Sequence, residues 1–242
     1  MRNWLLVLIL IFCFADSFAQ KQDKHDHTVG YHNIFYSGIQ INTNGFGGSV
    51  RRGFHKTARK KKLFEMGFNT LKHPREVKML SSDGGDGFVF AKKNSAFNLR
   101  LGKGEHNVIA FKPFGEGIEL KTIYAFGINT TFLKPIYYYM AYGDNQTVQL
   151  EKFDEDQHNV YNVVKSGSYF KGFKEIALQP GIFGKFALNF EYAVEKSSIR
   201  SLEVGAIVDG YYKDVEILAF ADNYPIIVSL YLSFQYGKKW YR

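Results

Sequence analysis

Residues 185–192 read KFALNFEY, and the stretch alternates strictly between two kinds of side chain. One set is apolar or aromatic: Phe186, Leu188, Phe190 and Tyr192. The other set is small or polar: Lys185, Ala187, Asn189 and Glu191. A period of two residues indicates a β-strand whose two faces meet different surroundings. This stretch therefore predicts a strand and defines the pattern to look for elsewhere in the chain.

The same alternation recurs along the rest of the chain, whereas helical periodicity is scarce. The other alternating stretches are 38–43, 46–54, 63–70, 96–101, 119–126, 201–208 and 228–236. Together with 185–192 they make eight candidate strands, and we see no internal repeat and no separate second domain. The fold class predicted from the sequence is therefore all-β.

The apolar faces of these strands can point inward, as in a soluble sandwich or lipocalin-like barrel, or outward to lipid. Three observations favour lipid. Short connections alternate with long ones, and the polar faces mix small with charged residues, as in a filled barrel interior. Aromatic residues also gather near strand ends, at Tyr137–Tyr139, Tyr211–Tyr212 and Trp240–Tyr241, which is typical of membrane interfaces. We predict an eight-stranded antiparallel transmembrane β-barrel over residues 34–242.

The amino terminus predicts export. Arg2 precedes an apolar run from Leu5 to Phe14, and small residues stand at Ser17 and Ala19. This pattern is typical of a cleaved signal peptide, here residues 1–19, followed by a flexible periplasmic segment at 20–33. After residue 20, no apolar run approaches the ~20 residues that a spanning helix needs. The expected location is the cell outer membrane.

The order of the strands predicts which connections face outward. With both termini in the periplasm, the outer connections are the Asn44-Gly45 hairpin and the loops 72–94, 129–182 and 209–225. The periplasmic connections are 55–61, 103–117 and 194–199. A connection as long as 129–182 is usually functional or disordered. We therefore expect the three long loops to contact a protein partner.

The polar strand faces carry charged residues that point into the predicted barrel. The positive ones are Arg51, Arg100, Lys121 and Lys185, and the negative ones are Glu65, Glu119, Glu191 and Glu203. Their charges cancel, and an eight-stranded barrel is just wide enough for side chains to fill it. Charges removed from water should pair, because an unpaired buried charge is costly. A proton or ion path, or a catalytic carboxylate site, stays open, but a salt-bridged plug is favoured.

Histidines offer two further candidate sites. His25 and His27 stand beside acidic residues near the amino terminus, but one short cluster is weak evidence for a metal site. His158 lies near Asp154 and Asp156 in the longest loop, where a rim enzyme would need a nucleophile, and none is distinguishable. None of the seven histidines falls within a predicted strand. We predict no metal, no cofactor and no catalytic residue.

The chain is basic, with a net charge of +8 and a pI near 9.3. Much of the positive charge lies at Arg51-Arg52 and between Lys56 and Lys62, at the first periplasmic connection. An exported barrel meets little nucleic acid, so nucleic acid is not an expected partner. Attraction to anionic membrane groups explains the charge more simply.

Several local patterns together resemble a known family. They are Asn42-Thr43-Asn44-Gly45-Phe46-Gly47, Lys72-His73-Pro74-Arg75-Glu76, Lys92-Lys93-Asn94, Leu133-Lys134-Pro135, Phe170-Lys171-Gly172, Pro180-Gly181 and the terminal Gln235-Tyr236-Gly237-Lys238-Lys239-Trp240. From about residue 33 to its end, the chain resembles small outer-membrane β-barrel proteins of Bacteroidota. The resemblance implies an accessory role in the cell envelope, beside outer-membrane assembly or secretion machinery. It supplies no catalytic residues.

The carboxyl terminus also resembles the signal that the barrel-insertion machinery reads. Tyr236, Gly237 and Trp240 match that signal, although the chain ends in Arg242 rather than an aromatic residue. The partners expected from the sequence are thus outer-membrane lipid, the insertion machinery and a protein bound by the long loops. The alternatives to a non-enzymatic accessory barrel are a small solute pore and a rim-site enzyme acting on lipid or peptide.

Overall fold

The computed structural model describes residues 33–57, 59–80, 87–112, 117–142, 147–192 and 197–240. The predicted signal peptide, the segment 20–32 and both His25 and His27 lie outside these residues. In the described part of the chain, no helix is long and apolar enough to cross a membrane.

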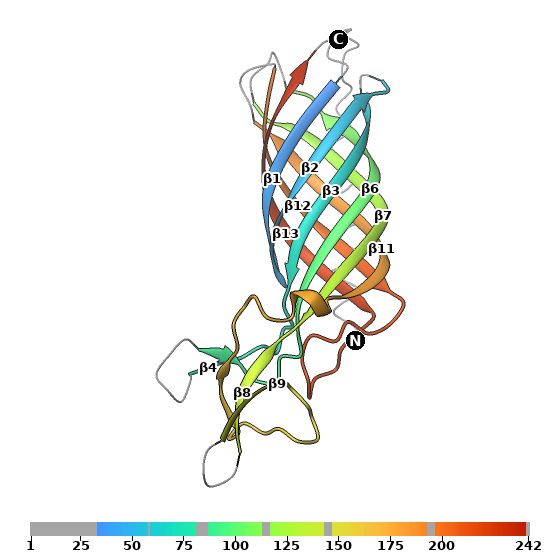
Figure 1. Ribbon diagram of the computed structural model, residues 1–242. Helices are drawn as coiled ribbons and strands as arrows, with labels where there is room; N and C mark the ends of the chain where they lie inside the picture. Colours follow the sequence, from blue (N-terminus) through green and yellow to red (C-terminus); the bar gives the residue numbers. More distant parts are fainter. Residues whose placement is uncertain are drawn as a thin grey trace, which may run out of the picture.

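Eight long strands form one closed barrel (Figure 1). They are β1 (Asn33–Asn42), β2 (Gly45–His55), β3 (Lys60–Leu71), β6 (Asn94–Ala110), β7 (Glu119–Pro135), β11 (Ala177–Glu191), β12 (Ser198–Tyr211) and β13 (Ile226–Trp240). Each pairs antiparallel with its neighbours in the order β1-β13-β12-β11-β7-β6-β3-β2, and the pairing of β1 with β2 closes the ring. The prediction of an eight-stranded antiparallel barrel is confirmed.

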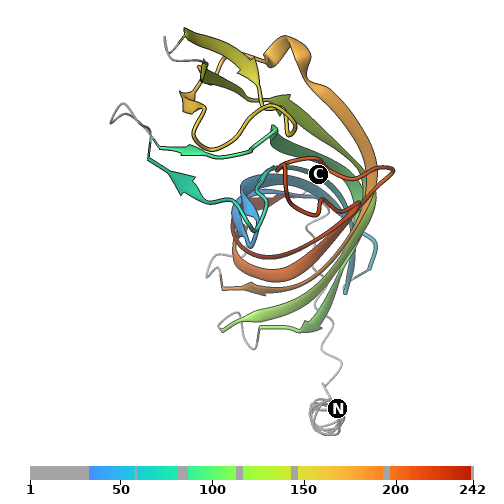
Figure 2. The same ribbon diagram turned by 90° about the horizontal axis from the view of Figure 1, so that it is seen from below.

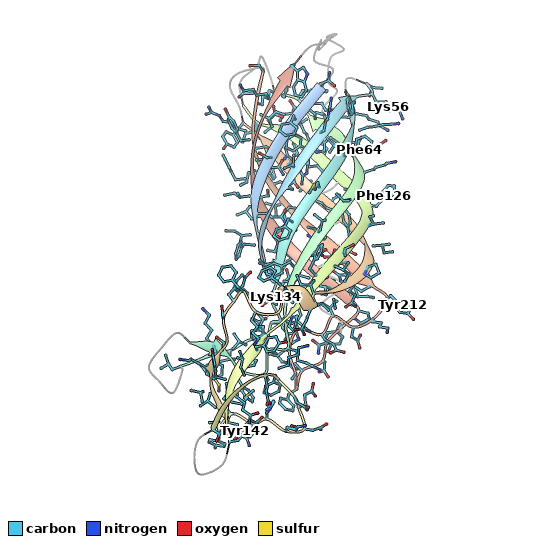
Figure 3. All side chains as sticks on the ribbon, in the orientation of Figure 1. Lys56, Phe64, Phe126, Lys134, Tyr142 and Tyr212 are labelled. Atoms are coloured by element: carbon cyan, nitrogen blue, oxygen red, sulfur yellow. The ribbon has the colours of Figure 1, made fainter. Side chains whose placement is uncertain are left out.

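The barrel has apolar side chains on its outer surface and polar side chains in its interior, the reverse of a soluble protein. Ile39, Phe126 and Ile182 lie on its outer surface and are 73%, 71% and 69% exposed, whereas Glu203 and Gln235 are fully buried inside. Figure 3 shows Phe64 and Phe126 pointing away from the barrel wall. An apolar outer surface this extensive is stable in lipid but costly in water. The strands therefore form a membrane-spanning barrel, as the alternation predicts.

The first hairpin shows why a glycine is needed beside the turn. Thr43 and Asn44 form the two-residue turn, and Gly45 already pairs with Asn42, so the turn lies one residue earlier than predicted. A Cβ atom on Gly45 would lie 2.2 Å from the main-chain oxygen of Thr70 on β3. Only a residue without a side chain fits this close approach.

The connections alternate in length, as predicted, although several of them are shorter than expected. At the end where β1 begins, the connections are 56–59, 111–118 and 192–197, and at the other end they are 43–44, 72–93, 136–176 and 212–225. The predicted connections 103–117, 129–182 and 209–225 were too long, because β6, β7, β11 and β12 all run further. The sequence did not indicate these longer strands, because polar residues such as Lys103 and Thr130 occupy outward positions near the strand ends and interrupt the alternation.

The three long connections fold together into a small unit, which we call the lobe. Its elements are the three-stranded sheet β10-β8-β9, formed by β8 (Tyr137–Tyr142), β9 (Thr147–Lys152) and β10 (Val163–Ser166), the pair β4 (Lys78–Met79) and β5 (Phe88–Val89), and the 3-10 helix η2 (Phe173–Glu175). Phe88, Met140 and Ala219, one from each connection, share its hydrophobic core. Seen from below in Figure 2, the lobe lies to one side of the barrel mouth.

Candidate functional site

The centre of the barrel is filled by a cluster of paired charges. Both terminal nitrogens of Arg51 donate to the carboxylate of Glu203, at 2.5 and 2.7 Å. Glu65 lies 2.9 Å from Nε of Arg51 and accepts a hydrogen bond from Lys185 at 2.8 Å. The hydroxyl of Tyr231 also donates to Glu203, at 2.6 Å. Two cations and two carboxylates thus compensate one another inside the barrel.

A second ion pair lies nearer the lobe. Nε and Nη2 of Arg100 donate to the two carboxylate oxygens of Asp209, at 2.8 and 2.5 Å. Asn129 donates to the same carboxylate at 2.7 Å. The sequence placed Asp209 in the connection 209–225, and this was wrong because β12 continues to Tyr211. The residue that balances Arg100 was therefore missed.

A third cluster of charged residues lies inside the barrel near the end where β1 begins and β13 ends. Lys121 pairs with Glu119 at 3.1 Å and also contacts Glu191, which in turn contacts Lys239. The buried Lys61 belongs to the same region of the interior. Lys61 was expected in the periplasmic connection 55–61, and neither Lys61 nor Lys239 was predicted to point inward. Both stand in runs of lysine in which only alternate residues do so.

His106 is a further buried residue that the sequence assigned elsewhere. It was expected in a connection, but it lies within β6 and is 3% exposed. Its Nε2 is 2.9 Å from the hydroxyl of Tyr36 on β1, so this pair bridges the interior. The strand pattern of β6 could have revealed it, since His106 has the same parity as Asn98 and Arg100.

The charged interior leaves little free space. The cavity between Tyr36, His106 and Glu191 measures about 10 Å³, which is at the lower limit of what one water molecule needs. All eight charged residues predicted to point inward do lie inside the barrel. Seven are buried and Glu119 is partly exposed. The arrangement is that of a plug: each of the eight has a partner of opposite charge within 4 Å.

His158, the histidine considered for a rim enzyme, has a structural role in the lobe. Its Nδ1 accepts a hydrogen bond from the main-chain nitrogen of Asp154 at 2.9 Å, so the ring proton of the neutral form is on Nε2. Nε2 lies 2.6 Å from the hydroxyl of Tyr142, which donates to Glu151 at 3.0 Å. These contacts tie the 153–162 segment to β8 and β9. They do not form the nucleophile, histidine and carboxylate arrangement of a hydrolase.

The three connections of the lobe are tied to one another by polar contacts as well as by their shared core. Lys93 lies 3.0 Å from Glu155 and 3.2 Å from Glu216, which joins all three connections. Tyr137 donates to Glu175 at 2.6 Å, and Lys152 contacts the same carboxylate. These two hydrogen bonds, first that from Lys152, lower the pKa of Glu175. These contacts link the three connections and hold the lobe together.

The surface of the lobe exposes aromatic side chains. Tyr161, Tyr212, Phe220 and Tyr224 are between 60% and 92% exposed. Figure 3 shows Tyr212 pointing outward at the barrel mouth. Tyrosine and phenylalanine are enriched at protein interfaces. Among the described residues there is no group of three or more histidine, cysteine or acidic residues that could hold a metal ion.

Comparison with known proteins finds similar solved structures but no matching family. No protein-family model matches the chain, and no curated protein matches it. Three solved structures are similar over 88% of this chain and 98–100% of their own chains. They are Neisserial surface protein A (10% identity, TM-score 0.47), the attachment invasion locus protein Ail of Yersinia pestis (5%, 0.43) and a major outer membrane protein of Thermus thermophilus (11%, 0.48). At these identities no function is carried over to this chain.

Proposed function

We propose that this protein is a non-enzymatic outer-membrane barrel that holds the lobe outside the membrane to bind a protein partner of the cell envelope. One observation carries the proposal: three separate connections share a single core, and Phe88, Met140 and Ala219 meet in it. Simple strand connections need no such core. The partner would be a component of outer-membrane assembly or secretion machinery, for which this barrel acts as an accessory subunit.

The plugged interior supports an anchoring role. Arg51, Glu65, Lys185 and Glu203 occupy the centre of the barrel and bind one another. A barrel that transports solutes would need to displace these ion pairs. The lobe is therefore the better candidate for the working part of the molecule, and the barrel for its support.

The proposed location and orientation rest on the sequence and the arrangement of the ends. Residues 1–19 would direct export. The start of β1 and the end of β13 both lie at the end of the barrel opposite the lobe (Figure 1). In outer-membrane barrels short turns face the periplasm and long loops face outward. Tyr236 and Trp240 lie on the outer face of β13, where the insertion machinery could contact them together with Gly237.

Site-specific photo-crosslinking in intact cells tests the proposal. A crosslinker at Tyr161 or Phe220 should yield one discrete adduct with an envelope protein. The control is the same crosslinker at Phe126, which faces lipid and should give no protein adduct. Replacing both Tyr161 and Tyr212 by Ser should reduce copurification of the adduct partner, while Val148→Ser, another exposed lobe position, should not.

Heat-modifiable migration of each variant in a detergent gel would report whether its barrel is folded. If folded protein gives no adduct at either lobe position, or if the partner copurifies equally with the double variant, the proposal is wrong.

A further inference from the structure

A cavity of about 210 Å³ lies where the lobe meets the outer wall of the barrel. Its lining includes three lysines and three serines, Lys92, Lys134, Lys171, Ser95, Ser166 and Ser168, together with the tyrosines Tyr137, Tyr138 and Tyr169. No aspartate or glutamate lines it among the described residues. Ammonium and hydroxyl groups without a carboxylate suit an anionic group that accepts several hydrogen bonds.

The two barrel-strand residues that line the cavity stand at outward positions of the barrel wall. Ser95 of β6 and Lys134 of β7 are register partners, and both point outward, because their neighbours Ala96 and Leu133 are packed in the interior. The next outward pair towards the opposite end of the barrel is Phe97 and Phe132. The cavity thus lies directly beyond an apolar surface that faces lipid.

Beyond the outward pair Leu99 and Thr130, the apolar surface resumes on the same two strands. Leu101 and Ile128 are also register partners, and they are 44% and 62% exposed. An acyl chain lying over Phe132 and Ile128 would therefore lead from the hydrocarbon region to the cavity.

The sheets of the lobe lie to one side of the barrel, over the region that lipid around the barrel would occupy (Figure 2). Figure 2 shows these sheets, in green and yellow, beside the barrel mouth, and Figure 3 places Lys134 at the junction between barrel and lobe. Tyr169, Phe170 and Phe173 pack against one another next to Lys134, and Phe170 is 80% exposed. Exposed aromatic residues at the end of a lipid-facing surface are typical of the headgroup region. This position is the one expected for lipid headgroups around the barrel.

The cations of the cavity are only partly neutralised. Lys92 is paired with Glu76 at 2.8 Å. Lys134 donates to the main-chain oxygen of Tyr169 at 2.5 Å and lies 4.0 Å from the centre of its ring, and its side chain is buried. Lys171 lies 5.0 Å from the ring of Tyr137. Within the described part of the chain, neither Lys134 nor Lys171 forms an ion pair with a carboxylate.

From this geometry we propose that the cavity binds the phosphate-bearing headgroup of a membrane lipid in the leaflet on the lobe side. Lys134 and Lys171 would donate to the phosphate oxygens, the serine hydroxyls would complete its hydrogen bonds, and the acyl chains would run over Phe132 and Ile128. The site rests on insertion of the barrel in a membrane and is independent of the proposed protein partner.

Native mass spectrometry of the full-length protein in detergent tests the site. The probe is lipid A with its two phosphates, compared with the same lipid after dephosphorylation and with inorganic phosphate. The wild type should retain one lipid A molecule and little of the dephosphorylated lipid. Lys134→Met combined with Lys171→Ala should lower retention about tenfold, the loss expected when charge-assisted hydrogen bonds are removed.

The matched control is Lys174→Ala, which removes an exposed lysine three residues from Lys171 that does not line the cavity. It should retain lipid A as the wild type does. The single variant Lys171→Ala tests the site without a change in the packed interior, because Lys171 is exposed. It should lower lipid A retention several-fold. Equal retention by the wild type and the double variant would overturn the site, and binding of inorganic phosphate without retention of lipid A would overturn the lipid as its occupant.

The crosslinking experiment gives a separate result. Loss of the protein adduct with lipid retention intact would refute the proposed partner and leave the lipid site standing, and the opposite pattern would refute the lipid site alone.

Discussion

Arg51 and Glu203 meet in the centre of the barrel, although their strands β2 and β12 are not neighbours in the sheet. Their bidentate contact spans the interior and joins strands that share no backbone hydrogen bonds. Glu65 and Lys185 complete the cluster from β3 and β11. The side chains therefore connect four strands, of which only β2 with β3 and β11 with β12 are paired neighbours.

Removing one charge of this cluster should destabilise the barrel strongly. Glu203→Gln leaves Arg51 and Lys185 with one carboxylate between them, and an uncompensated buried charge costs about 3 to 5 kcal/mol. Urea unfolding of the protein in lipid vesicles measures the change. Val204→Ala on the lipid-facing side of β12 is the control and should cost much less. An unfolding free energy unchanged in Glu203→Gln would contradict a structural role for the cluster.

The same cluster predicts that the barrel does not conduct ions. In planar bilayers the wild type should show no steady conductance, because paired side chains fill the centre. Arg51→Ala combined with Glu203→Ala removes the bidentate ion pair at the centre and should produce measurable channel openings. Steady ion currents through the wild type would instead support the solute-pore alternative.

Strand number and side-chain orientation could be predicted from the sequence because lipid and the barrel interior demand opposite side chains at alternate positions. Phe186 and Lys185 illustrate this, since they are adjacent and meet lipid and an ion pair respectively. Strand ends could not be predicted in this way. Beyond the hydrocarbon region the outward positions become polar, as at Lys103, so the alternation of β6 fades although the strand continues to Ala110.

The lobe was beyond sequence reasoning for a different reason. Its core joins residues that are far apart in the chain, such as Phe88 and Tyr138, whose ring centres are 6.2 Å apart. Strands as short as β4, with two residues, show no readable period. The sequence therefore predicts only that the longest loop is functional or disordered. Its ordered core and the cavity beside it become apparent only in the three-dimensional structure.

The lobe should unfold independently of the barrel. Phe153 packs against Tyr138 and Phe220, so Phe153→Ala should cost the lobe about 3 kcal/mol or more. Trypsin should then cleave the connection 136–176, while heat-modifiable migration shows an intact barrel. Val148→Ala, at an exposed lobe position, should leave the cleavage rate unchanged. Loss of the folded barrel in Phe153→Ala would show that lobe and barrel fold as one unit.

The basic end of the barrel should attract anionic lipid during insertion. Lys60 and Lys62 on β3 are exposed and point outward, and Lys56 extends from the same end in Figure 3. A lysine near an anionic membrane surface contributes about 1 kcal/mol of attraction. Lys60→Glu combined with Lys62→Glu should therefore slow insertion into vesicles containing phosphatidylglycerol, measured by the appearance of the heat-modifiable form. In vesicles of phosphatidylcholine alone the two proteins should insert at equal rates, because there the surface charge is absent. A variant that is slower in both kinds of vesicle would point to a folding defect instead of electrostatic attraction.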